Sequence, residues 1–167
     1  MTPPPFQWFL DEHRDDVYRF LIAAVGAQEA DDCFQETFLS AMRAYPRLRV
    51  NSNTRAWVLT IAHRKALDSY RARQRRPLPV AEPPEPRRLP SQPLPSQPLS
   101  SDGAAEPDAD LWSEVRRLPG KQRAAVALRY AGDLSHDEIG QVLGCSEDAA
   151  RRNLHEGLKK LRSTWKA

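Results

Sequence analysis

The chain has 167 residues, of which 40% are hydrophobic, and a formal net charge of +3 at pH 7. This length allows one large domain or two small ones. No apolar run approaches the ~20 residues of a membrane span, so we expect a soluble, cytoplasmic protein without a membrane partner. The two cysteines, Cys33 and Cys145, form no CxxC pair and indicate neither a disulfide framework nor a zinc site.

Three amphipathic helices are predicted in the first part of the chain. Residues 6–25 place apolar side chains at intervals of three and four residues, and Gly26 follows as a terminator. A second helix covers EADDCFQETFLSAMRAY, residues 29–45, and stops at Pro46. After a polar loop, Asn53 or Thr54 can cap a third helix over residues 54–76. We therefore expect a small all-α domain over residues 1–76.

Charge is divided unevenly within this first domain. Residues 1–46 carry eight acidic side chains and three arginines, whereas residues 47–76 carry nine lysines or arginines and one acid, Asp68. An acidic segment followed by a basic segment predicts two partners, one of them a polyanion. The alternative interpretation is that both are ordinary solvated helix faces.

A proline-rich segment separates the two halves of the chain. Residues 77–107 contain ten of the 15 prolines, including the small repeat LPSQPLPSQPLS. Such a segment has too few apolar residues to offset the entropy of ordering it. We therefore predict a flexible linker rich in extended polyproline conformation.

Residues 108–167 predict a second helical domain that contains a helix-turn-helix. Ser135 and Glu138 have the spacing of a capping box, Gly144 permits a tight left-handed turn, and Ser146 can cap a longer helix. Gly140 is small where the two helices are expected to cross. One face of the longer helix is apolar, and the other is basic: Arg151, Arg152, His155, Lys159 and Arg162. This pattern favours DNA reading in the major groove, with a plain helical hairpin as the alternative.

In this order, the motifs resemble those of bacterial RNA polymerase sigma factors of the sigma-70 family, extracytoplasmic-function (ECF) type. Residues 29–45 resemble the polymerase-binding segment, and TRAWVLTIAHRKALDSYRARQRR, residues 54–76, resembles the promoter −10 segment. Residues 118–162 resemble the domain that reads the −35 element. The resemblance implies an all-α fold of two small helical domains, region 2 at 1–76 and region 4 at 108–167, with the linker at 77–107.

The resemblance also implies which residues bind. The polymerase-binding residues would be Asp32, Gln35, Glu36, Phe38 and Leu39. The −10 DNA-binding residues would be a base-capturing loop and the helix after it: Asn51, Ser52, Asn53, Trp57, His63, Arg64, Arg71, Arg73, Arg75 and Arg76. The −35 DNA-binding residues would be Ser146, Arg151, Arg152, Asn153, His155 and Lys159.

The implied function is that of a sigma factor, which binds core RNA polymerase and promoter DNA and directs initiation; whether an anti-sigma factor is a further partner is left open. The sequence shows no nucleophile motif, metal-ligand spacing or phosphate-binding loop, so we expect no enzyme activity, cofactor, metal or small-molecule substrate. One alternative is a stand-alone helix-turn-helix transcription regulator, which leaves the acidic Gln35–Glu36 face unexplained. Another is a protein-interaction module that binds no DNA.

Overall fold

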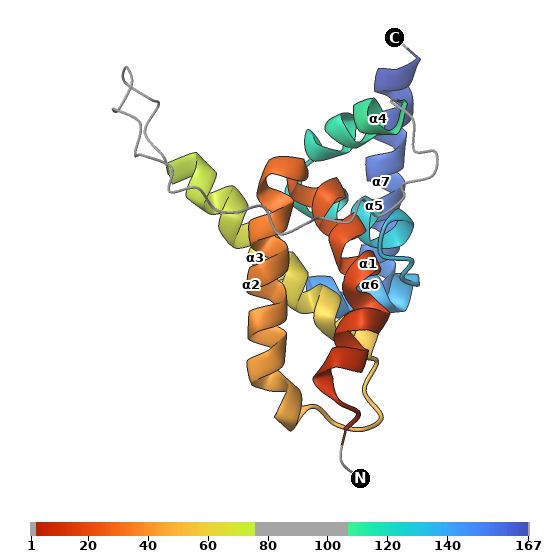
Figure 1. Ribbon diagram of the computed structural model, residues 1–167. Coiled ribbons are helices and arrows are strands. Elements are labelled where there is room, and N and C mark those ends of the chain that lie inside the picture. The colour runs from red at the N-terminus through yellow and green to blue at the C-terminus, as the bar shows by residue number, and fades with distance from the viewer. Residues whose placement is uncertain (1–2, 76–106, 167) are drawn as a thin grey trace, which may run out of the picture.

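The computed structural model describes residues 3–75 and 107–166, and every regular element in these two ranges is a helix. The predicted all-α fold is confirmed. The first domain comprises three long helices and one short 3-10 helix (Figure 1): α1 (Phe6–Val25), α2 (Ala27–Ala44), η1 (Tyr45–Arg47) and α3 (Thr54–Arg75). Residue 76 and residues 77–106 of the predicted linker lie outside the described residues. Pro107, which we assigned to the linker, is the first residue of α4.

Aromatic rings hold the first domain together at the end where the chain begins. The Phe9 ring lies 5.2 Å from the Tyr45 ring and 5.6 Å from the Trp57 ring, centroid to centroid, so one residue of α1 contacts both of the following segments. At the opposite end, Gly26 has φ +85° and joins α1 directly to α2. A glycine adopts this conformation without steric cost, which allows the sharp reversal between the two helices.

The second domain comprises α4 (Pro107–Arg116), α5 (Gly120–Tyr130), α6 (His136–Leu143) and α7 (Glu147–Trp165). The predicted capping box is confirmed, because the Ser135 hydroxyl accepts from the Glu138 amide at 3.3 Å and the Glu138 carboxylate accepts from the Ser135 amide at 2.7 Å. The predicted cap of α7 is also confirmed, since the Ser146 hydroxyl accepts from the amide of Ala149 at 3.1 Å. These contacts satisfy amides that the first turn of each helix leaves unpaired. Together α6 and α7 form the helix-turn-helix.

The turn between α6 and α7 depends on two glycines. Gly144 has φ +69°, in the left-handed region, as predicted. A Cβ atom at Gly140 would lie 2.8 Å from the carbonyl oxygen of Cys145 and 3.3 Å from the backbone of Ser146. The close approach at Gly140 is therefore to the turn itself, rather than to a crossing helix as the sequence suggested.

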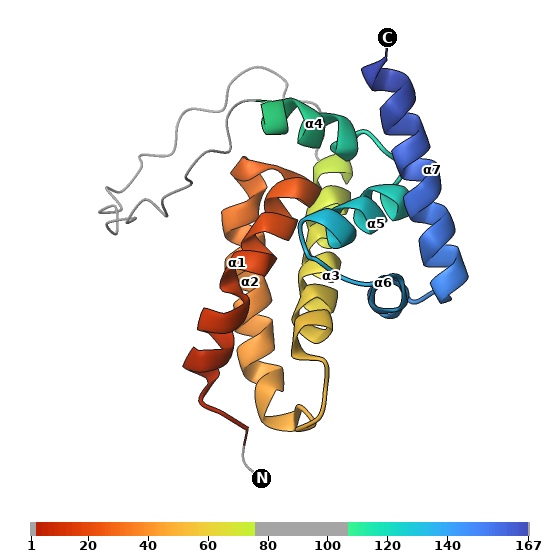
Figure 2. The same cartoon turned by 90° about the vertical axis from the view of Figure 1, so that its right-hand side faces the viewer.

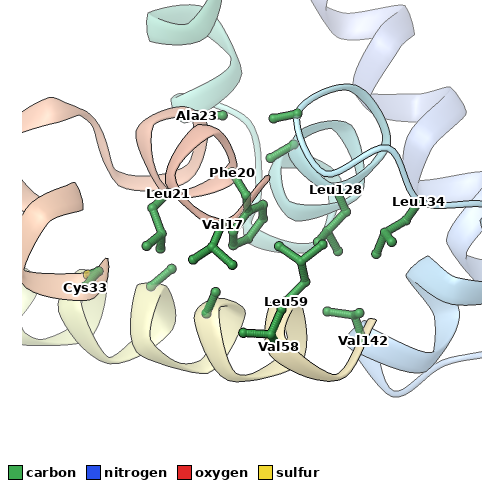
Figure 3. Close-up of a cluster of buried hydrophobic side chains, with 14 of the residues drawn as sticks. Val17, Phe20, Leu21, Ala23, Cys33, Val58, Leu59, Leu128, Leu134 and Val142 are labelled. Carbon is green, nitrogen blue, oxygen red and sulfur yellow. The ribbon is translucent and has the colours of Figure 1, made fainter. Parts of the chain in front are cut away.

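The two domains pack against each other along α3 and α1. In Figure 2, α5 and α6 lie beside α3, α4 lies across one end of the first domain, and α7 stands on the far side of the second domain. Leu59 of α3, Leu128 of α5 and Leu134 have no exposed surface and lie together between the domains (Figure 3). The structure therefore has one apolar core that both domains share, an arrangement that the sequence analysis did not address.

Candidate polymerase-docking face and nucleic-acid interfaces

The outward face of α2 presents acidic and apolar side chains side by side. Asp32, Gln35 and Glu36 are exposed, and Leu39 is 45% exposed. Met42, which the sequence analysis passed over, lies one turn further along and is 49% exposed. The sequence could have indicated Met42, because it follows Leu39 by three residues and residues at i and i+3 share a helix face. This set of five residues, the α2 face, offers a partner both carboxylates and apolar contact.

Phe38 lies on the other side of α2, although the family resemblance grouped it with the polymerase-binding residues. It is 6% exposed, and its ring centroid lies 4.8 Å from that of Phe34 and 6.5 Å from that of Phe9. An aromatic side chain packed in this way contributes to the core of the domain. Phe38 therefore supports the α2 face from within and offers no surface to a partner.

Asn53, the last residue of the loop before α3, anchors the loop through two side-chain hydrogen bonds. The Asn53 side-chain oxygen accepts from the amide of Ala56 at 3.0 Å, so Asn53, rather than Thr54, caps α3. The Asn53 amide nitrogen donates to the Glu138 carboxylate of α6 at 2.5 Å. Asn51 is exposed and Ser52 is half-buried, which leaves the rest of the loop accessible to a ligand.

Arg55, in the first turn of α3, is a further charged group at this loop that the sequence analysis did not select. Its Nε lies 3.1 Å from Asp16 of α1, and its Nη1 lies 3.7 Å from Asp133 of the second domain. The Asp16 side chain is only 13% exposed, so the Arg55 guanidinium neutralises a largely buried carboxylate. In the sequence, the only feature that could have singled out Arg55 was its position close to the cap of α3.

Two of the predicted −10 residues on α3 are partly enclosed. Trp57 is half-buried, with its ring edge-on to Phe9. His63 lies against α5, where burial, with smaller contributions from Arg123 and Arg64, lowers its pKa from 6.5 to about 4. His63 is therefore neutral at pH 7 and adds no positive charge to this surface.

The second half of α3 carries the cationic surface that the sequence predicted. Arg64, Arg71, Arg73 and Arg75 are all exposed, whereas Arg76 lies outside the described residues. Arg73 also reaches across to Glu29 of α2, with its Nη2 3.2 Å from the carboxylate. Three guanidinium groups, those of Arg64, Arg71 and Arg75, show no acidic partner among the described residues and suit phosphate contacts.

The exposed face of α7 carries most of the predicted −35 residues. Arg152, His155 and Lys159 are exposed, and Arg151 is exposed but ion-paired with Glu147 at 3.1 Å. Asn153 is half-buried, with its amide nitrogen donating to the Ala149 carbonyl at 3.0 Å. Ser146 contributes as the cap of the helix. Arg152 is thus the arginine most available for contact with a base edge.

An apolar groove of about 550 Å³ opens on the second domain between α4, α5 and α7. Leu111, Trp112, Val126 and Leu158 line it, and Trp165, at 63% exposed, stands at its rim. The sequence analysis did not predict this groove, because periodicity alone does not reveal where neighbouring helices diverge. The groove offers an apolar contact surface on the side of the domain away from α3.

No helix in the described ranges is long and apolar enough to cross a membrane. Residues 3–75 and 107–166 also contain no group of three or more His, Cys, Asp or Glu side chains placed to hold a metal ion.

Both domains match families of known proteins. Residues 9–76 match the Sigma-70 region 2 family, and residues 109–161 match the family described as Sigma-70, region 4. The chain therefore belongs to the sigma-70 family, whose members direct promoter-specific transcription initiation by RNA polymerase.

Within this family the chain is similar to ECF RNA polymerase sigma factors. ShbA of Streptomyces griseus is 33% identical over 136 residues, which are 80% of this chain and 70% of ShbA. SigE of Mycolicibacterium smegmatis is 31% identical over 160 residues, which are 95% of this chain and 61% of SigE. The structure of the sigma factor RpoE of Bartonella quintana, solved with the anti-sigma factor NepR, has a TM-score of 0.73 at 20% identity, covering 97% of both chains. This last likeness shows the fold.

Proposed function

We propose that this chain binds core RNA polymerase through the α2 face and directs initiation at promoters that the loop and α3 read at −10 and α7 reads at −35. The observation that carries the proposal is the presence of two chemically different surfaces in one chain. The α2 face is acidic and apolar, whereas α3 and α7 present arginines and lysines. A protein that binds DNA alone has no evident need for the first surface.

The α2 face suits a protein partner with basic and apolar side chains. Within the described residues, Glu36 has one long ion pair, 3.8 Å from Lys65, and Leu39 and Met42 expose apolar surface beside it. Complementary charges across an interface orient the partners and accelerate association, while apolar contacts at the centre supply most of the affinity.

The loop before α3 and the cationic half of α3 suit an opened DNA strand. Extruding a base costs a few kcal/mol, which favourable contacts must offset. Asn51, Ser52 and Asn53 supply hydrogen-bonding groups for a base edge, and the exposed arginines of α3 supply phosphate contacts. The first domain thus combines groups that read a base with groups that hold the backbone.

The recognition helix α7 suits the major groove of the −35 element. Arg152 and Arg151 lie in its first half, where helix-turn-helix proteins contact base edges, and Lys159 lies further along for the phosphates. An arginine pairing with a guanine discriminates against other bases by ~1–3 kcal/mol. No reaction is assigned to this chain, because the polymerase performs the chemistry.

An anti-sigma factor is included among the proposed partners. RpoE was solved in complex with NepR, and CnrH, with a TM-score of 0.69 to this chain, was solved with the cytosolic domain of CnrY. Those complexes show that chains of this fold accept such partners, and we extend the partner class to this protein.

Reconstitution with purified core RNA polymerase tests the proposal. We expect the chain to co-purify with core polymerase and to direct initiation from some promoters of a genomic library. The double variant Gln35→Ala/Glu36→Lys should weaken core binding without unfolding the chain. The matched control is Gln7→Ala/Glu12→Lys, which makes the same two changes at exposed positions of α1. Equal core affinity of the two double variants would contradict the assignment of the α2 face, and DNA binding without any core binding would indicate a stand-alone regulator.

A further inference from the structure

Three arginine side chains line a small pocket of about 180 Å³ at the end of the molecule where α1 ends and α4 crosses the first domain (Figure 2). Arg73 comes from α3, Arg116 from the last turn of α4 and Arg123 from near the start of α5. The remaining lining residues come from α1 and α3: Ala24, Val25, Ser69 and Tyr70. Four helices therefore build the pocket, and three of them contribute a guanidinium group.

Two of these arginines are partly or wholly removed from bulk water and are held by neutral groups. Arg123 is 8% exposed; its Nη1 donates to the Arg116 carbonyl at 3.2 Å, and its guanidinium lies 4.5 Å from the centre of the Tyr70 ring. Arg116 is half-buried, and its Nη1 donates to the carbonyl of Ile22 in the last turn of α1 at 3.3 Å. Backbone oxygens and an aromatic ring thus fix these guanidinium groups without neutralising their charge.

The pocket carries more positive charge than the carboxylates around it balance. Within the described residues, Glu29 is the one acidic side chain that pairs with any of the three arginines, and its carboxylate lies 3.2 Å from Arg73 Nη2. Burial, with a smaller contribution from the charge of Arg73, lowers the pKa of the Arg116 guanidinium, which nevertheless stays protonated at pH 7. Because a buried charge without a counter-charge is costly, an anion in the pocket would stabilise this arrangement.

We propose that this pocket binds a small phosphate-bearing anion, with the guanidinium groups of Arg73, Arg116 and Arg123 as its ligands. A guanidinium group presents paired N–H donors that match the oxygens of a phosphate group. The pocket volume lies below the ~300 Å³ of pockets that accept drug-sized molecules, so it suits one or two phosphate groups rather than a nucleotide. The inference goes beyond the proposed function, because the occupant is neither DNA nor polymerase; of the three arginines, Arg73 alone is also a proposed DNA-binding residue.

Binding at this site should be coupled to the stability of the whole chain. Arg73 belongs to the first domain, whereas Arg116 and Arg123 belong to the second, so an anion bound by all three contacts both domains at once. A ligand that binds the folded chain and not the unfolded chain raises the free energy of unfolding by mass action. The melting temperature should therefore rise with the concentration of the anion.

Calorimetric titration of the full chain with inorganic pyrophosphate at constant ionic strength measures the binding. The test variant is Arg73→Gln/Arg116→Gln, and the matched control Arg71→Gln/Arg117→Gln removes two exposed arginines from the same two helices. Since the test variant loses charged hydrogen-bond donors to the anion, we expect it to bind pyrophosphate at least about tenfold more weakly than the wild-type chain, and the control to stay within about twofold. Pyrophosphate should raise the melting temperature of the wild-type chain and the control, but not of the test variant.

A second pair of variants predicts an effect of opposite sign. Glu29→Gln removes the carboxylate that competes with the anion for Arg73, so it should tighten pyrophosphate binding about two- to fivefold. Its control, Asp11→Asn, removes one negative charge from an exposed position of α1 near the other end of the first domain. This pair leaves the hydrogen bond from Arg116 to α1 intact, so it provides the test even if Arg73→Gln/Arg116→Gln does not fold.

The inference is wrong if millimolar pyrophosphate shows no saturable one-to-one binding to the wild-type chain. Equal losses of affinity in the two double variants would also overturn it, because they would indicate a general attraction of anions to the basic surface of α3. Equal affinities of Glu29→Gln and Asp11→Asn would contradict the placement of the anion beside Arg73.

Discussion

Leu59→Ala removes three carbon atoms from a fully buried side chain at the point where α3 meets the second domain. At roughly 0.8 kcal/mol per carbon, the lost burial accounts for about 2.4 kcal/mol of the free energy of unfolding. The cavity left behind adds to this, and substitutions of this kind cost about 2–5 kcal/mol in total. We expect about 3–4 kcal/mol, because backbone atoms near Gly132 and Leu128 limit how far the site can collapse.

The location of Leu59 also predicts how the unfolding transition changes. If both domains share one core, the wild-type chain should unfold in a single cooperative transition. Loss of the Leu59 side chain should weaken the coupling, so that the two domains unfold at different denaturant concentrations. Leu21→Ala is the matched control, since Leu21 is also fully buried but faces Cys33 within the first domain (Figure 3).

Guanidinium titrations followed by circular dichroism and by tryptophan fluorescence measure both effects. Trp8 and Trp57 lie in the first domain and Trp112 and Trp165 in the second, so the fluorescence titrations use variants that keep tryptophan in one domain only. The reasoning fails if Leu59→Ala costs less than about 1 kcal/mol, or if it separates the two transitions no more than Leu21→Ala does.

Three further predictions concern pH, the turn and DNA. Because burial lowers the folded pKa of His63 from 6.5 to about 4, the unfolded chain protonates first as the pH falls. The free energy of unfolding should therefore decrease between pH 6.5 and 4, by at most ~1.4 kcal/mol per pH unit, and a His63→Gln variant should show a flatter pH profile in denaturant titrations. Gly140→Ala should lower stability by about 1–3 kcal/mol in thermal melts, because its Cβ would lie 2.8 Å from a backbone carbonyl, whereas Gly120→Ala, with no atom within 4 Å, should not. Arg152→Ala should relax selectivity at one −35 base pair. Arg75→Ala should instead weaken binding to all DNA sequences and lower the slope of log binding constant against log salt concentration by about one. Equal effects of the two variants in holoenzyme binding assays would contradict the proposal that Arg152 reads a base and Arg75 binds a phosphate.

Local structure was largely predictable because its causes are local. The capping box at Ser135 and Glu138, the left-handed Gly144 and the cap at Ser146 each depend on residues within three positions of each other, and the structure contains all of them. The exposed arginines of α3 and the basic face of α7 followed from helical periodicity in the same way. The family resemblance supplied their roles, and those roles remain proposals.

What the sequence left open depends on contacts between distant residues. Phe38 and Leu39 are adjacent and both apolar, and only the position of Phe34 and Phe9 decides that the first is buried and the second exposed. Asn53 and Glu138 are 85 residues apart, and no pattern in the chain indicates their contact. Periodicity shows which face of a helix is apolar, but not which neighbour covers it.

The carboxylate of Glu138 has a consequence for how sigma factors of this kind can be recombined. One oxygen completes the first turn of α6 and the other binds the first domain, so one side chain of the second domain contributes both to its own helix and to the association of the two domains. A chimera that joins α1–α3 to the second domain of a relative would change this association together with the exposed face of α7. Domain exchange would therefore alter how the two domains associate as well as the surface that is proposed to read the −35 element.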